Sequence, residues 1–150
     1  EDCFEDCFED CFEEVREDTF TQSIENNKEE PFLCYLSLNA PHSPFNVPED
    51  YYKMYEKESE LLESQKRFYG MISNIDSNFE RLRQKLEQLQ IIDNTILIFT
   101  TDNGTSNGYK FDQKENKWYG YNAGMRGTKT SEYDGGHRVP FLLYWKTEAW

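Results

Sequence analysis

Three stretches of the chain are apolar or β-branched with almost no alternation: Phe32–Leu38, Thr95–Thr101 and Val139–Trp145. This pattern is typical of strands that are covered on both faces, as in a parallel sheet flanked by helices. A different pattern fills the space between the first two stretches. Apolar residues recur there every three or four positions, at Ile72, Ile75, Phe79, Leu82, Leu86 and Leu89. That spacing predicts an amphipathic helix from about Glu60 to Leu89.

The order strand, helix, strand predicts a βαβ unit with parallel strands and a right-handed crossover. We therefore predict that Phe32–Leu38 and Thr95–Thr101 are parallel, with the helix packed across both. An earlier helix is expected to pack on the body through Phe20 and Ile24. In such a unit the carboxyl ends of the strands meet at one edge of the sheet, where ligands bind. His42 and Asp102 each follow a strand end, so both are expected at that edge.

The strand of Thr95–Thr101 stops at the tripeptide Asp102-Asn103-Gly104. Adjacent carboxylate and amide oxygens suit a hard cation such as Ca²⁺ or Mg²⁺. Two other readings compete. Asn-Gly is a strong hairpin-turn signal, and Asn103-Gly104-Thr105 fits an N-glycosylation sequon. We adopt the metal interpretation on the strength of the motifs that follow.

Thr105 to Arg138 is long and rich in Gly, Asn, Lys and Tyr. Segments of this length within a compact domain are usually functional or disordered. For Lys129 to reach Asp102, this segment must fold back on the strand end. Taken alone, Lys129 reads as a solvated lysine, and His42 between Pro41 and Ser43 reads as part of a turn.

The charge of the chain is concentrated at its start. The formal net charge is -13, of which residues 1–30 carry -11 (13 acids, 2 bases) and residues 31–150 carry -2 (16 acids, 14 bases). This balance argues against nucleic-acid binding. No apolar run is long enough to span a membrane, and the acidic start does not resemble a signal peptide.

Residues 1–12 are Glu-Asp-Cys-Phe three times over. We interpret residues 1–18 as an acidic low-complexity leader, and residues 19–150 as part of one domain. A thiol-rich metal or redox stripe is the less favoured reading of the repeat. Cys34, in the first apolar stretch, is expected to be a buried and inert thiol.

Four segments together resemble the sulfatases, the type I, arylsulfatase-like enzymes of the alkaline phosphatase superfamily. They are Pro41-His42-Ser43-Pro44, Asn94 through Gly104, Met125 through Lys129, and Tyr133 through Phe141. Each segment is a weak signal alone, but all occur in the family order. The resemblance implies a three-layer α/β fold with a mostly parallel sheet flanked by helices, and hydrolysis of aryl or carbohydrate sulfate esters.

By the same resemblance, Asp102 and Asn103 match metal ligands for Ca²⁺ or Mg²⁺. His42 matches a histidine that contacts the sulfate, and Lys129 matches a lysine that bridges the sulfate and the leaving oxygen. Arg126, His137 and Arg138 are expected to hold the loop. The family also implies a secreted, periplasmic or lysosomal-type compartment, although the sequence itself does not identify one.

The sequence departs from the family in one respect. Sulfatases use a formylglycine made within a Cys/Ser-x-Pro-x-Arg motif, and none of the five prolines here has Cys or Ser two residues before it. We therefore interpret the chain as a part of a sulfatase catalytic domain that carries half a site and is inactive alone. Two alternatives stay open: a phosphoester or phosphonate hydrolase of the same superfamily, and a non-catalytic binding protein on the same scaffold.

Overall fold

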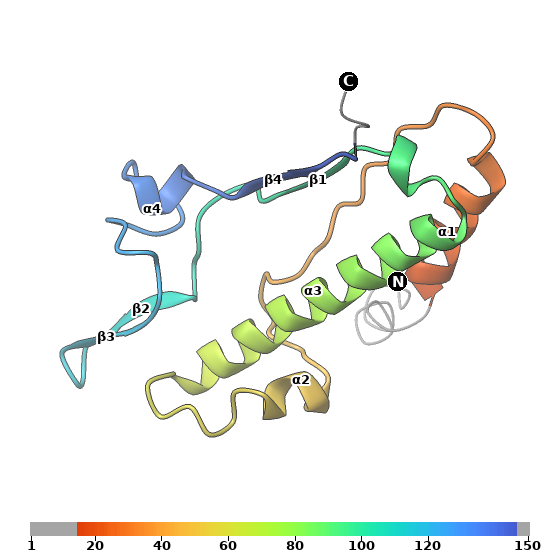
Figure 1. Ribbon diagram of the computed structural model, residues 1–150. Helices are drawn as coiled ribbons and strands as arrows, with labels where there is room; N and C mark the ends of the chain where they lie inside the picture. Colours follow the sequence, from red (N-terminus) through yellow and green to blue (C-terminus); the bar gives the residue numbers. More distant parts are fainter. Residues whose placement is uncertain (1–14, 147–150) are drawn as a thin grey trace, which may run out of the picture.

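The computed structural model describes residues 15–146, arranged along one long helix, α3 (Glu63–Gln88). Figure 1 shows α1 (Val15–Asn27) and the 3₁₀ turn η1 (Ile92–Asn94) at one end of α3. The β2–β3 hairpin and the short helix α4 (Asp134–His137) gather at the other end. The Glu-Asp-Cys-Phe repeat lies outside the described residues. Among the helices of residues 15–146, none is both long and apolar enough to cross a membrane.

Helix α3 confirms the prediction made from its apolar spacing, to within a few residues at its start. Leu86, which is 1% exposed, packs with Ile24 of α1 and Ile92 of η1 in the apolar core. Partly buried side chains surround these three: Leu82, Leu89, Ile91 and Leu97. The predicted packing of Ile24 on the body is therefore confirmed, while the side chain of Phe20 lies outside the described residues.

Strand β1 (Leu97–Thr100) pairs antiparallel with β4 (Phe141–Tyr144), with Leu97 opposite Tyr144 and Thr100 opposite Phe141. One face of this two-stranded sheet lies on α3: Leu97 joins the core, and the Phe99 ring meets Phe79 edge-on at 6.1 Å. The opposite face is apolar and exposed, since Ile98 and Leu143 each show more than half of their surface. Both stretches were predicted as strands, and both are confirmed.

The prediction that Phe32–Leu38 is a strand of the same sheet, parallel to β1, is wrong for the described residues. This segment forms no strand, and the partner of β1 is β4. Cys34 is an exposed free thiol rather than the buried one predicted. The physical reason is a missing cover, because Leu33 is 97% and Tyr35 89% exposed. An apolar segment becomes a buried strand only where a neighbouring strand and a covering layer are present.

The segment after β1 holds structure that the apolar pattern did not predict. Strands β2 (Tyr109–Asp112) and β3 (Lys117–Gly120) form an antiparallel hairpin. Its turn is held by the Asp112 carboxylate, which accepts the backbone N–H groups of Lys114 and Glu115 at 2.7 and 3.1 Å. Helix α2 (Glu49–Lys53) packs on the start of α3, where the Arg67 guanidinium lies 4.9 Å from the centre of the Tyr52 ring.

Candidate functional site

Asp102 and Asn103 follow β1 after one intervening residue, Thr101, and form a bend rather than a hairpin turn. The Asn103 side-chain amide donates to a carboxylate oxygen of Asp102. The Thr101 hydroxyl donates to the Asn103 carbonyl at 3.2 Å, which fixes the backbone of the bend. Asp102 is exposed and Asn103 is half-buried. The two side chains therefore present oxygen atoms at the strand end, as the sequence predicted for their position.

Gly104 is the point at which the returning segment closes on the strand end. Its N–H donates to the Gly136 carbonyl at 2.9 Å. A Cβ atom at position 104 would lie 1.9 Å from the Gly135 carbonyl oxygen. Only glycine permits this approach, so the third residue of the tripeptide serves the close packing of α4 on the bend.

Lys129 is brought back to the same bend although it lies 24 residues beyond Thr105. The Lys129 N–H donates to the Thr105 carbonyl at 2.8 Å. The side chain is half-buried. Within residues 15–146, its ammonium group has neither a hydrogen bond nor an ion pair. The segment thus folds back to the strand end, as predicted, and the backbone of Lys129 lies against Thr105, two residues beyond Asn103.

The interior of the returning segment is held by polar contacts of its own. The buried Asn122 amide donates to the Gly127 carbonyl at 2.7 Å, and the Gly135 N–H donates to the Arg126 carbonyl at 2.8 Å. The Arg126 guanidinium lies 3.5 Å from the centre of the Tyr133 ring. Arg126 therefore packs within the loop, in agreement with the role predicted for it.

His42 lies on a separate loop. Its Nδ1–H donates to the Ser43 carbonyl at 2.8 Å, which leaves Nε2 for another partner. The loop reaches α3 through Phe45, whose ring meets the buried Phe68 edge-on at 6.0 Å. Phe68 also lies against the turn at Gly108. The loops thus share a contact on α3, but across the described part of the chain no hydrogen bond joins His42 to Asp102, Asn103 or Lys129.

Gln65 anchors the hairpin to the first turn of α3. This side chain is fully buried, and its amide N–H₂ donates to the carbonyls of Asn107 and Tyr119 at 3.1 and 2.9 Å. Its oxygen accepts the Leu62 N–H at 3.0 Å. The apolar pattern of the sequence did not predict a role for Gln65. The available signal was its spacing, because Gln65 lies three residues before Phe68 and seven before Ile72, on the apolar stripe of the helix.

Tyr69 makes a second anchor, one turn further along α3. Its hydroxyl donates to the Gly108 carbonyl at 2.7 Å and accepts the Tyr121 N–H at 3.1 Å. Burial raises the pKa of the Tyr69 phenol above its ordinary value, an effect that the Tyr121 N–H partly opposes. The phenol therefore stays protonated and keeps its donor role at neutral pH.

The family model for sulfatases matches residues 6–149. The chain belongs to the sulfatase family. It is 36% identical over 139 residues to an N-acetylgalactosamine-6-O-sulfatase of Bacteroides thetaiotaomicron, covering 84% of this chain and 24% of that protein. It is 29% identical over 120 residues to the uncharacterized sulfatase YdeN of Escherichia coli, covering 79% of this chain and 20% of that protein. The chain thus spans about a fifth to a quarter of these relatives.

A solved structure with a similar fold is that of Ps i-CgsB in complex with k-i-k-neocarrahexaose. It matches with a TM-score of 0.64 and 28% identity, over 86% of this chain and 28% of that one. The structural neighbours are sulfatases with the alkaline-phosphatase-like α/β fold, and the described residues form a part of that fold. The predicted family and fold class are therefore confirmed, although both sheets in the described residues are antiparallel.

The bend at Asp102 offers the right type of ligand atom for a hard cation, but too few ligands to hold one. Carboxylate and amide oxygens are ligands that Ca²⁺ accepts, and Ca²⁺ usually takes six to eight oxygens. Over residues 15–146, no group of three or more His, Cys, Asp or Glu side chains is placed to hold a metal ion. Asp102 and Asn103 would therefore supply one part of a larger ligand set.

Proposed function

We propose that this chain carries the part of a sulfuric ester hydrolase that binds the sulfate group and a divalent cation. Asp102 and Asn103 would hold Ca²⁺ or Mg²⁺, while His42 and Lys129 would bind the sulfate. The observation that supports the proposal is the return of the segment after Thr105 to the end of β1. There the Gly104 N–H donates to the Gly136 carbonyl, and the Lys129 N–H donates to the Thr105 carbonyl. These bonds bring the backbone of Lys129 to the segment that follows the two proposed oxygen ligands, which supports a role for its ammonium group there.

The charges of these groups suit a sulfate ester, which bears negative charge on its non-bridging oxygens. When bound, the cation would neutralise part of the charge that builds on those oxygens in the transition state. The Lys129 ammonium would oppose the charge on the leaving oxygen. The hydrogen bond from Nδ1–H to the Ser43 carbonyl orients the His42 ring and would leave Nε2 for contact with the sulfate.

The nucleophile is expected from a formylglycine, and residues 1–150 contain no Cys/Ser-x-Pro-x-Arg motif in which to make one. Serine and threonine are weak nucleophiles without an activating base or metal. We propose that this chain binds sulfate but does not turn over a sulfate ester by itself. The substrate class we propose is aryl or carbohydrate sulfates, in line with the names of the curated relatives.

Binding is the property to test first. In an NMR titration of the 150-residue chain with sodium sulfate, we expect the amide resonances around Thr105 and Lys129 to shift. Lys129→Gln should weaken the binding about fivefold or more, because the charge-assisted donor proposed to hold the sulfate is lost. The matched control is Lys114→Gln, which removes an exposed lysine from the turn between β2 and β3 and should leave the affinity unchanged.

Metal dependence and turnover complete the test. Ca²⁺ should bind at about millimolar concentration or more weakly, and Asp102→Asn should abolish the shifts it causes at the bend. Release of 4-nitrophenol from 4-nitrophenyl sulfate should not be detected, with or without Ca²⁺. Equal sulfate affinity in the wild type and Lys129→Gln would contradict the proposed binding role. Turnover that is lost in Asp102→Asn would contradict the proposed inactivity.

A further inference from the structure

The β2–β3 hairpin carries three aromatic rings on one face. Tyr109, Phe111 and Trp118 share this face because Phe111 is directly opposite Trp118 in the ladder and Tyr109 is two residues from Phe111. The Trp118 ring stacks on Tyr109 with centroids 4.5 Å apart and planes 13° from parallel. It meets the Phe111 ring at 5.3 Å and 53°. The three rings form one continuous cluster, which we call the aromatic platform.

Glycine at position 120 makes the stacking geometry possible. Gly120 is opposite Tyr109 in the ladder and has no side chain, so Trp118 lies diagonally across onto the Tyr109 ring. The backbone at Gly120 has a φ of +81°, and a Cβ there would lie 2.1 Å from the Gly108 carbonyl oxygen. The position therefore requires glycine for both its conformation and its close packing.

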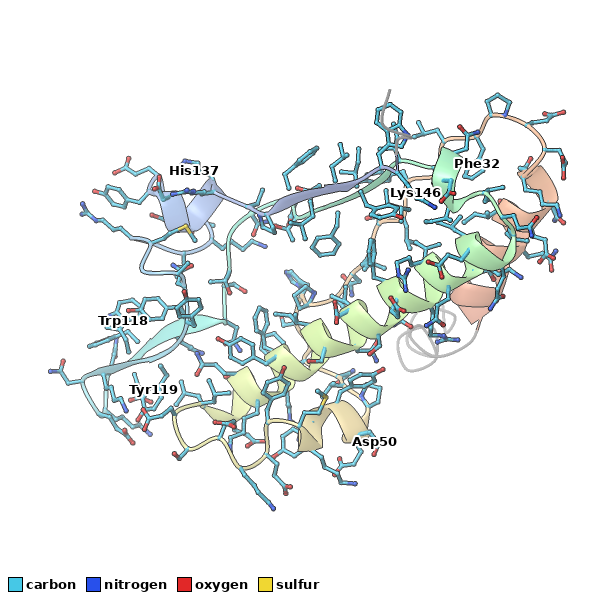
Figure 2. All side chains as sticks on the ribbon, in the orientation of Figure 1. Phe32, Asp50, Trp118, Tyr119, His137 and Lys146 are labelled. Carbon is cyan, nitrogen blue, oxygen red and sulfur yellow. The ribbon has the colours of Figure 1, made fainter. Side chains whose placement is uncertain are left out.

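The platform faces solvent although the hairpin itself is firmly anchored. Trp118 is 49% exposed and Phe111 39%, whereas Tyr119 on the other face is buried. Figure 2 shows Trp118 on the side of the hairpin toward α4 and Tyr119 on the opposite side, toward the start of α3. The bonds from Gln65 and Tyr69 hold the buried side of the hairpin. The exposed rings are thus presented on a fixed support.

Thr105 connects the aromatic platform with the proposed sulfate site. The Thr105 hydroxyl accepts the Gly108 N–H at 2.7 Å at the base of the hairpin, and the Thr105 carbonyl accepts the Lys129 N–H at 2.8 Å. Tyr109 is the first residue of β2, and Phe111 lies about 7 Å further along at the usual rise of a strand. Thr105 therefore joins the base of the hairpin to the backbone of Lys129, and the rings follow one another along β2 and β3 from that base.

We propose that Tyr109, Phe111 and Trp118 bind a sugar ring of a sulfated oligosaccharide whose sulfate group lies at Lys129. This inference rests on the proposed function and names its substrate class. A sugar ring presents a face of C–H groups that packs flat on an aromatic ring, while its hydroxyl groups stay in water. Stacking within the hairpin explains the Tyr109–Trp118 pair but not the exposed outer surface of Trp118.

The names of two similar proteins support a carbohydrate as the substrate class. One is the N-acetylgalactosamine-6-O-sulfatase that is 36% identical to this chain, and the other is the structure of Ps i-CgsB with a bound neocarrahexaose. A small aryl sulfate would occupy the sulfate site without reaching the outer rings. The chain should therefore bind sulfated oligosaccharides more tightly than small sulfate esters, because only the oligosaccharides contact the platform.

The test uses the 150-residue chain and three probes: sodium sulfate, 4-nitrophenyl sulfate and a chondroitin 6-sulfate tetrasaccharide. In ¹H–¹⁵N spectra, the tetrasaccharide should shift the indole N–H resonance of Trp118, and sodium sulfate should not. Trp118→Ala should weaken tetrasaccharide binding about tenfold and leave sulfate binding unchanged. Trp118→Phe should retain most of the affinity. The matched control is Trp145→Ala, which removes a tryptophan of similar exposure, 54%, beyond the end of β4.

The possible results separate the two proposals. If the tetrasaccharide leaves the Trp118 indole resonance in place while sulfate still binds through Lys129, the platform inference is overturned and the sulfate site stands. If neither sulfate nor the tetrasaccharide binds, the proposed function fails and the inference fails with it. If Trp118→Ala disturbs the hairpin, the Trp118→Phe variant and the wild-type indole resonance still decide the question.

Discussion

The two small sheets of this molecule are held in place by different forces. The β1–β4 sheet lies on α3 through apolar contacts, with Leu97 in the core and Phe99 against Phe79. The β2–β3 hairpin is attached to the same helix by hydrogen bonds from Gln65 and Tyr69 to backbone carbonyls. The first sheet follows from hydrophobic burial, which is not directional, whereas the second depends on a few polar atoms in fixed positions.

This difference matters for the candidate site because each sheet supplies a different part of it. The apolar sheet delivers Asp102 and Asn103 at the end of β1. The polar anchors fix the hairpin, whose base at Gly108 is bonded to the Thr105 hydroxyl, and the Thr105 carbonyl accepts the Lys129 N–H. Loss of apolar packing should therefore unfold the body, whereas loss of a polar anchor should loosen the hairpin and leave the body folded.

The largest effect is expected from the apolar side. Leu86→Ala should lower the free energy of unfolding by about 3 kcal/mol, because it leaves a cavity between α1, α3 and η1. The matched control is Ile98→Ala on the exposed face of β1, with an expected cost under about 1 kcal/mol. Urea unfolding followed by circular dichroism measures both. Equal costs for the two variants would mean that the outer face of the sheet is covered in solution.

The apolar body was predictable from the sequence because periodicity and hydrophobicity report burial. Helix α3, strand β1, strand β4 and the burial of Ile24 all follow from these patterns. The failure at Phe32–Leu38 has the same origin. Hydrophobicity shows that a segment suits a covered strand, but it does not show whether the covering layer is present among the described residues.

The hairpin and the return of Lys129 were less predictable, for a physical reason. The turn at Asp112 has no glycine, and the hairpin is positioned by the buried amide of Gln65, which an apolar pattern treats as an interruption. The sequence placed Asp102 and Asn103 at a strand end, and it required the long segment to fold back. The bonds that achieve this join backbone atoms of Gly104, Thr105 and Lys129, so no side-chain pattern shows them.

An intermediate effect is expected from the main polar anchor. Gln65→Leu should cost about 2 kcal/mol, because it leaves the Asn107 and Tyr119 carbonyls without their donor in a buried place. Amide hydrogen exchange should accelerate in β2 and β3 and change little around Leu86. The matched control is Gln84→Leu, whose amide makes an exposed bond to Glu80 on the same helix. Uniform acceleration along the whole chain would contradict the separation of hairpin and body.

The smallest effect at neutral pH is expected from Tyr69→Phe, and its distinguishing feature is its pH dependence. Removing the hydroxyl takes a donor from the Gly108 carbonyl and an acceptor from the Tyr121 N–H, at a cost of about 1 kcal/mol. Because burial raises the pKa of Tyr69 in the folded state, the folded chain holds this proton more tightly than the unfolded chain. Its contribution is therefore fully present below the ordinary pKa of 10.0 and is lost as the pH rises through the folded value. Wild type should lose more stability than Tyr69→Phe between pH 9 and 11, measured by urea unfolding.

Some alkaline loss should persist in the variant, since hydrogen bonds to Glu63 and Glu115 raise the pKa values of Tyr52 and Tyr119. Tyr35→Phe, at a side chain that is 89% exposed, serves as the control and should follow the wild type. Parallel pH profiles for wild type and Tyr69→Phe would show that the phenol does not anchor the hairpin.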